Sequence, residues 1–440
     1  MLQLRKLQDS ILGQKFKKNN VLLFYMSVIM LVISNYRLII FRLENTFNIG
    51  AAYKDEIGFL SSYLNFKNNG WYQSVSDGCS PLFNLATLLI NYFINDPVYA
   101  MRTVSVFAMI LTILIWTLFT YKHTSFAKGF KILVFLFFIN VILVRQAYFT
   151  ATDDPLFILF ISLAFMAVYI GIKSNYKQNI AFVLGGLSFA AAAATRPLFV
   201  FYISGFLLVF LILLLKQQNF FKSILLFFLS FLTLLSFVHY PSLIEKRKLS
   251  VHNKDFIDID VKWSEMDYIF LLRNKEKLLY GRNNKLKPTP EEVVQYRKDN
   301  GENSTPKTYI ESIKMIPKDL YVKNYIGLLY LQALPFLRQI GLFYPFFIIL
   351  SFFYLYRKKN NKSSMIFPLI FYVLFTLSHF IIPIVHLEFR RFMLFIPLVT
   401  SFSFIFIQDI FVNYREVKYS LIYMNIILIG ILNALYIGLW

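Results

Sequence analysis

Long runs of apolar residues, separated by short polar connections, recur along almost the whole chain. About 20 apolar residues are enough to cross the hydrocarbon core of a bilayer as a helix, and most of the runs approach or reach that length. The pattern therefore predicts an all-α, polytopic membrane protein. The runs cover residues 21–42, 81–95, 98–120, 131–150, 155–172, 180–195, 197–215, 221–240, 337–356, 364–384, 392–411 and 419–438.

The run at 81–95 decides the topology, because it is short and contains Asn84 and Asn91. Lysine and arginine in short connections normally face the cytoplasm. If 81–95 lies in the outer interface instead of spanning, most basic connections fall on the cytoplasmic side together with the N-terminus. We therefore expect about 11 transmembrane helices, with 81–95 as an extracytoplasmic interfacial helix. The basic connections contain Lys122, Lys128, Lys131, Lys173, Lys177, Lys216, Lys222, Arg357, Lys358, Lys359, Lys362, Arg415 and Lys418.

This topology divides the chain into three parts. Residues 1–240 form an N-terminal membrane module, whose first outer loop at 43–97 is expected to be catalytic. Residues 241–330 are polar, charged and interrupted by prolines, which indicates an extracytoplasmic loop domain. Residues 331–440 supply the C-terminal transmembrane helices. The first outer loop, the turn at 151–154 and the loop domain then lie on the same, outer side.

Composition agrees with a membrane location. The chain has 440 residues, of which 57% are hydrophobic and 19% aromatic, and a soluble domain cannot bury that much apolar surface. The net charge of +21 comes largely from the basic connections, which favours membrane lipids over nucleic acid as the partner. Cys79 is the only cysteine, so an intrachain disulfide and a cysteine metal cluster are excluded. We expect a multi-pass protein of a bacterial inner membrane.

The first outer loop contains an acidic pair, Asp55-Glu56, soon after the first apolar run. A carboxylate at the membrane interface can accept a proton from a substrate hydroxyl, provided that it lies within hydrogen-bond reach and that partial burial raises its pKa. Asp55 is the candidate catalytic base, and Glu56 is counted with it among the candidate catalytic residues. A solvated loop pair without a catalytic role is the alternative.

A second acidic pair, Asp153-Asp154, precedes Pro155 at the start of another apolar run. Aspartate followed by proline fits a helix N-terminus, with Asp154 as the cap and the proline at the first helical position. Asp153 is then freer to face a substrate or an ion, and both aspartates are counted among the candidate catalytic residues. Arg196, between two apolar runs at the same outer side, can pair with one of these acids or bind a phosphate.

A third group of charged residues lies just before the run at 392–411. It consists of His386, Glu388, Arg390 and Arg391. A phosphate leaving group needs cations that hold its developing charge, and Glu388 could keep one arginine in place. A charged collar at the membrane interface is the alternative. His239 and Arg247, at the entry to the loop domain, are further candidates for binding phosphate.

These features occur in an order that resembles the GT-C superfamily of integral-membrane glycosyltransferases, over most of the chain. The nearest likeness is to the protein O-mannosyltransferases and the lipid A aminoarabinose transferases. Ser80 departs from the pattern, because the nearer families often have lysine or histidine at that position. The residues that carry the resemblance are Asp55-Glu56, Ser80-Pro81-Leu82-Phe83, Arg102, Asp153-Asp154-Pro155, Thr195-Arg196-Pro197, His386, Glu388 and Arg390.

The resemblance implies a GT-C fold and an enzyme that moves a sugar from a polyprenyl-phosphate donor to an extracytoplasmic acceptor hydroxyl on a glycan, lipid or protein. It implies one inverting displacement, in which Asp55 removes the acceptor proton and the phosphate departs toward His386, Arg390 and Arg391. Arg196 and the start of the loop domain would help to hold the phosphate. No cofactor is required, although Asp153 and Asp154 could bind Mg²⁺ or Mn²⁺.

Two other functions stay open. An O-antigen polymerase or ligase would rely on arginine and histidine in outer loops, so that replacing Asp55 would have little effect. A transporter of lipid-linked glycans would place charges within the helices along a path, whereas the acids of this chain cluster at one surface. Arg102, Arg145 and Arg338 are the exceptions to that rule.

Overall fold

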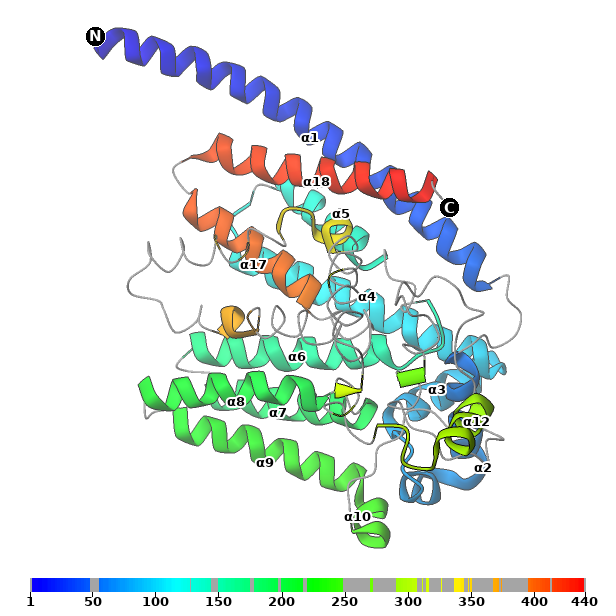
Figure 1. Ribbon diagram of the computed structural model, residues 1–440. Coiled ribbons are helices and arrows are strands. Elements are labelled where there is room, and N and C mark those ends of the chain that lie inside the picture. The colour runs from blue at the N-terminus through cyan, green and yellow to red at the C-terminus, as the bar shows by residue number, and fades with distance from the viewer. Residues whose placement is uncertain are drawn as a thin grey trace. The chain divides into compact units, whose positions relative to one another are not determined.

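The computed structural model is helical (Figure 1). It describes residues 2–47, 55–126, 128–143, 149–174, 178–196, 199–216, 220–247, 270–271, 290–306, 395–411 and 414–438, together with shorter stretches between 311 and 373. The chain forms two compact units. The first comprises Met1–Asp255, Leu337–Tyr372 and Phe392–Trp440, and the second comprises Phe256–Phe336 and Val373–Arg391.

The first unit contains nearly all of the described helices, and the second contains α12 (Pro290–Asn300). The helices of the first unit are α1 (Leu2–Phe47), α2 (Asp55–Ser76), α3 (Pro81–Ile94), α4 (Pro97–His123), α5 (Lys128–Leu143), α6 (Asp154–Lys173), α7 (Gln178–Thr195), α8 (Phe199–Lys216), α9 (Phe221–Val238), α10 (Tyr240–Lys246), α17 (Phe395–Ile410) and α18 (Arg415–Gly438).

Within the described residues, five helices are long and apolar enough to cross a membrane. They are Asn20–Phe41 within α1, and α4, α6, α7 and α9. The expected helical membrane protein is thereby confirmed, while the number of 11 spans and the GT-C fold stay predictions. Helix α3 has 14 residues and is about 21 Å long at 1.5 Å per residue, which is shorter than the hydrocarbon core of roughly 30 Å. This length agrees with the expectation that α3 does not span, and its interfacial position stays a prediction.

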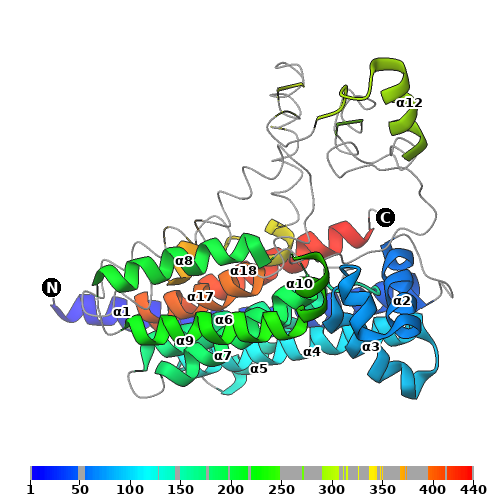
Figure 2. The ribbon, with the colours of Figure 1, turned by 90° about the horizontal axis from the view of Figure 1, so that it is seen from below.

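Helices α6, α7, α8 and α9 run side by side, with α7 against both α6 and α9 (Figures 1 and 2). Small residues allow α7 and α9 to approach closely. A Cβ atom at Gly186 would overlap the backbone carbonyl of Phe227, so this position accepts only glycine. The Ser230 hydroxyl donates to the Val183 carbonyl at 3.1 Å across the same contact.

Helix α17 is the most enclosed element, since all of its residues except Asp409 are buried. It packs against α4, α5 and α18, and the hydroxyls of Thr120 and Ser401 hydrogen-bond at 2.7 Å between α4 and α17. A helix that is apolar on every side is expected in the interior of a bundle. The described part of the hydrophobic run at 392–411 therefore lies in the core of this unit.

Buried amides join α1, α5 and α18. The Asn140 side chain donates to Ser34 at 2.8 Å and to Asn35 at 2.9 Å, and Asn433 donates to Asn140 at 3.1 Å. Water cannot replace these bonds in the bilayer core, so such contacts hold membrane helices together. They fix the first and last described helices of the unit beside each other, as Figure 1 shows.

Basic residues gather at one end of this unit. Lys173 Nζ at the end of α6 lies 3.4 Å from His123 Nδ1 at the end of α4. Lys418, early in α18, donates to Gln408 near the end of α17 at 3.1 Å, and Gln408 in turn donates to Ser125. The basic connections between the apolar runs were expected on one side of the membrane. Those that the structure describes lie at the same end of the first unit.

Candidate active site

A buried ion pair joins α2 to α4. Glu56 lies in the first turn of α2 and Arg102 in the second turn of α4, and both are 2% exposed. The Arg102 guanidinium donates from Nε to Glu56 Oε1 at 3.1 Å and from Nη2 to Oε2 at 2.8 Å. This parallel two-point geometry is a strong arrangement for an arginine and a carboxylate, and it fixes the orientation of both side chains.

The same carboxylate fixes the turn at 149–153, which precedes α6. The backbone N–H of Ala151 donates to Glu56 Oε1 at 2.7 Å, and the Ser105 hydroxyl of α4 donates to the Thr152 carbonyl at 2.9 Å. Glu56 therefore ties together the start of α2, the start of α4 and this turn. Because its oxygens already accept these hydrogen bonds, the geometry favours a positioning role for Glu56 over proton transfer.

A second buried network joins α6 to the end of α7. Arg196 Nη1 donates to Asp153 Oδ1 at 2.9 Å and also to Asp154 Oδ1, and all three residues are at most 5% exposed. The expectation that Asp154 caps the helix was wrong. Asp153 occupies the cap position, and no side-chain capping bond forms, because both carboxylates turn toward the arginine.

Arg196 was predicted either to pair with one acid or to bind phosphate, and the structure shows it bound to both acids. A buried charge is stable only when it is paired and hydrogen-bonded, which explains why the two aspartates and the arginine occur together. The positive charge between Asp153 and Asp154 opposes binding of a divalent cation there. Within the described ranges no group of three or more His, Cys, Asp or Glu gathers.

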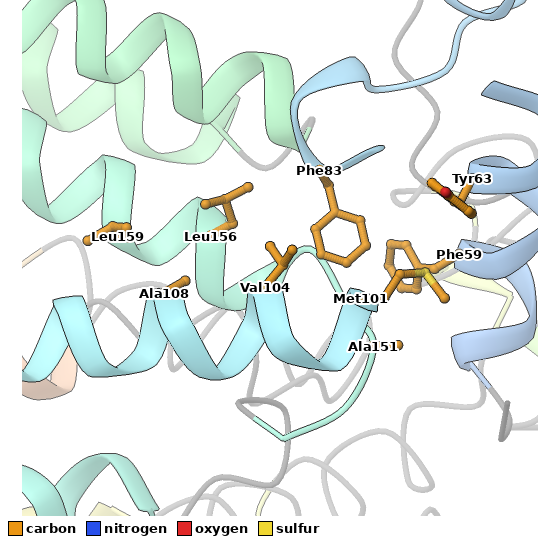
Figure 3. Close-up of a cluster of buried hydrophobic side chains, with 9 residues drawn as sticks. All are labelled: Phe59, Tyr63, Phe83, Met101, Val104, Ala108, Ala151, Leu156 and Leu159. Atoms are coloured by element: carbon orange, nitrogen blue, oxygen red, sulfur yellow. The ribbon is translucent and has the colours of Figure 1, made fainter. Parts of the chain in front are cut away.

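A cluster of buried apolar side chains joins α2, α3, α4 and α6 (Figure 3). Ala151 of the turn belongs to this cluster, and the rings of Phe59 and Phe83 meet edge to face at 5.8 Å. A dry, apolar surrounding strengthens the ion pairs and makes an unpaired charge costly. The cluster consists of Phe59, Tyr63, Phe83, Met101, Val104, Ala108, Ala151, Leu156 and Leu159.

These contacts bring distant segments to one end of the unit. The N-terminal ends of α4 and α6, the C-terminal end of α7 and the start of α2 meet through the two charged networks. His123 and Lys173 lie at the opposite ends of α4 and α6. The acidic residues and the basic connections therefore occupy opposite ends of the same helices.

Asp55 begins α2 and directly precedes Glu56, so its backbone lies at the same end as the two networks. Its side chain lies outside the described residues, and its role as the base stays a prediction. His386, Glu388, Arg390 and Arg391 also lie outside the described residues, and so does their proposed contact with phosphate.

His239 and Arg247 flank α10, which packs against α2. Glu245 accepts a hydrogen bond from Ser76, and Lys246 Nζ lies 3.8 Å from Asp77. His239 is fully buried at the junction of α9 and α10, and neither ring nitrogen has a hydrogen-bond partner within the part of the chain that the structure describes. Arg247 is exposed, so of these two phosphate candidates only Arg247 is open to a ligand.

Acidification should weaken the α9–α10 junction through His239. Burial lowers the pKa of its imidazole from 6.5 to about 4, so between these values the unfolded chain binds a proton that the folded chain excludes. Stability is therefore complete above the unfolded pKa and falls as the pH drops toward the folded pKa, by up to about 3 kcal/mol. Thermal unfolding of the purified protein between about pH 7.5 and pH 4.5 would measure this loss. The variant His239→Phe should show a smaller dependence, and an unchanged slope would contradict the assignment.

Three features of this region were not anticipated from the sequence. The pairing of Glu56 with Arg102 joins residues 46 positions apart, and the bond from Ser105 to the turn likewise depends on packing. The third is the burial of polar residues on α3. Asn84 and Asn91 within an otherwise apolar run were the signal that could have revealed it.

The chain was also compared with known proteins. No family model matches it, and no curated protein is similar to it in sequence.

Proposed function

We propose that the protein is an integral-membrane glycosyltransferase that uses a polyprenyl-phosphate sugar as its donor. The acceptor is a hydroxyl group of a glycan, lipid or protein outside the cytoplasm, and Asp55 is the base. One observation carries the proposal. Two buried networks, Glu56 with Arg102 and Arg196 with Asp153 and Asp154, hold the starts of α2, α4 and α6 together at the end where Asp55 lies.

The reaction is a single displacement at the anomeric carbon. The acceptor oxygen forms a bond to this carbon, and its proton passes to the Asp55 carboxylate. The bond between the anomeric carbon and the phosphate oxygen breaks, and the phosphate keeps the electron pair and leaves as polyprenyl phosphate. Cationic side chains stabilise the charge that develops on the phosphate, and Arg390, Arg391 and His386 are the candidates for this role. Inversion at the anomeric carbon follows from the single step.

The distribution of charge supports an extracytoplasmic site. Basic connections face the cytoplasm by the positive-inside rule, and His123 and Lys173 lie at the ends of α4 and α6 that are opposite to the acidic networks. At the outer face, nucleotide sugars are absent, so a lipid-linked sugar is the suitable donor. A base at the start of α2 is then close to both the membrane surface and the aqueous acceptor.

The variant Asp55→Asn tests the proposal in membranes that contain the full chain. We expect at least about a hundredfold loss of transfer, because general-base catalysis contributes roughly 10²–10⁴ in rate. Mass spectrometry of the extracted lipids and of the envelope glycans should show a polyprenyl-phosphate sugar accumulating while one glycan disappears. Asp77→Asn is the matched control, because Asp77 follows the same helix and is half exposed.

A glycan profile that is unchanged in Asp55→Asn, with the variant present at wild-type levels, would refute the assignment of the base. It would favour an O-antigen polymerase or ligase, whose chemistry does not need this carboxylate. Flux of a lipid-linked glycan without glycosyl transfer would favour a transporter.

A further inference from the structure

Helix α4 leaves one apolar side exposed along its length. Four exposed apolar residues are spaced by three, four and four positions, which places them on one face of the helix. Each is between 41% and 62% exposed. Because α4 is long and apolar enough to cross a membrane, this face is suited to contact the acyl chains of lipids. We call it the lipid-facing stripe of α4, and it consists of Phe107, Ile110, Leu114 and Leu118.

Lys122 continues this stripe at the basic end of the unit. It follows Leu118 by four residues, so it leaves the helix on the same face, and its side chain is exposed. Within the described residues no acidic side chain forms an ion pair with Lys122. A lysine stem can lie along apolar surface while its ammonium group reaches the polar headgroup region. Lys122 is therefore placed to meet the headgroup of a lipid whose chains lie on the stripe.

A second lysine is held beside the end of α4 by the neighbouring helix. Lys173, at the end of α6, is exposed, and its Nζ lies 3.4 Å from His123 Nδ1 and 5.4 Å from the centre of the Tyr169 ring. An ammonium group can only donate, so the imidazole accepts through Nδ1 and is neutral. Since His123 directly follows Lys122, this contact brings the charge of Lys173 close to the turn that carries Lys122.

These two lysines and the stripe select the class of partner. Two ammonium groups at adjacent helix ends repel each other, and an anion that contacts both relieves the repulsion. The neutral His123 adds no charge of its own. A free anion would leave the stripe without a partner, whereas a lipid brings acyl chains together with its headgroup. By the positive-inside rule this end faces the cytoplasmic leaflet, where anionic lipids attract basic residues.

We propose that Lys122 and Lys173 bind the anionic headgroup of a phospholipid whose acyl chains lie on the lipid-facing stripe of α4. Phosphatidylglycerol has the required chemistry, because it carries a net negative charge, whereas phosphatidylcholine is neutral overall. The surface lies at the ends of α4 and α6 that are opposite to the two acidic networks. The inference is therefore independent of the proposed transferase function, and either can fail without the other.

Native mass spectrometry of the purified full chain, in a neutral detergent, would measure the affinity for phosphatidylglycerol and for phosphatidylcholine with the same acyl chains. Wild type should bind phosphatidylglycerol about tenfold or more tightly. Lys122→Gln should reduce this preference to about threefold, because it leaves the contact of Lys173 with His123 intact. Lys122→Gln combined with Lys173→Gln should reduce it to about twofold or less. The corresponding pair of arginine replacements keeps both charges and should keep the preference.

Lys67→Gln combined with Lys298→Gln is the matched control. It removes the same charge from two exposed lysines on α2 and α12, and it should bind both lipids as wild type does. A wild type without a preference, or an equal preference in wild type and the double glutamine variant, would overturn the inference. Glycerol 1-phosphate carries the phosphate without acyl chains. If it competes as strongly as phosphatidylglycerol, the surface binds a free anion and the assigned lipid is wrong.

Discussion

Replacing Arg196 by methionine should destabilise the membrane unit by about 3–5 kcal/mol or more. The arginine is the described cation for two aspartates, Asp153 and Asp154, that are 1% and 2% exposed. Methionine fills a similar volume but removes the described charge partner of both buried carboxylates, and a buried charge that loses its compensation is costly. The unfolding temperature of the purified protein, its yield and its resistance to protease would measure the effect.

Combined replacement of all three residues should restore much of the lost stability. Arg196→Met with Asp153→Asn and Asp154→Asn removes all three described charges of this network, and neutral replacements of buried ion pairs are often tolerated. Lys246→Met is the matched control, because it removes a cation whose ion pair lies at the surface. The Lys246 side chain is 35% exposed and its Nζ lies 3.8 Å from Asp77, and such surface pairs contribute about 0–1 kcal/mol to stability. If Arg196→Met unfolds at the wild-type temperature, the network is not what holds α6 to α7.

The helices were largely predictable because the same apolar residues that favour the membrane also form the interior. The run at 98–120 became α4 (Pro97–His123), and the run at 155–172 became α6 (Asp154–Lys173). Proline in the first turn fixes the start of both helices. Helix α1 is 46 residues long, well beyond its apolar run at 21–42. Hydropathy marks where a helix crosses the membrane, whereas a helix itself can continue through polar residues.

The candidate site was predictable as a set of residues but not as a set of contacts. Charges on the same outer side suggested that Arg196 could meet an aspartate, and they do pair. The partner of Glu56 depends on how α2 packs against α4, which no local pattern encodes. The burial of Asn84 and Asn91 on α3 was hidden for a related reason. The usual rule that polar faces point outward reverses when lipid, rather than water, covers the surface.

Breaking the buried ion pair between Glu56 and Arg102 should give the second large loss of stability. Glu56→Gln leaves the Arg102 guanidinium buried without its described counter-charge, and loss of one partner of a buried pair costs about 3–5 kcal/mol. Glu56→Met combined with Arg102→Met removes both charges and should recover much of the stability. Unfolding temperatures of Glu56→Met, of Arg102→Met and of the double variant give the coupling between the residues, because the cycle isolates their pairwise interaction.

The double variant Glu56→Met/Arg102→Met should recover stability without recovering transfer activity. The double variant keeps a packed core but lacks the bond from Ala151 N–H to Glu56, so the start of α2 is no longer fixed to the turn before α6. Under the proposed mechanism, Asp55 then loses its alignment, and misplacement of a catalytic group by about 1 Å can cost roughly a hundredfold in rate. We therefore expect a stable double variant with the glycan profile of Asp55→Asn. A stable double variant that retains full transfer would show that Glu56 supports the fold without positioning the base.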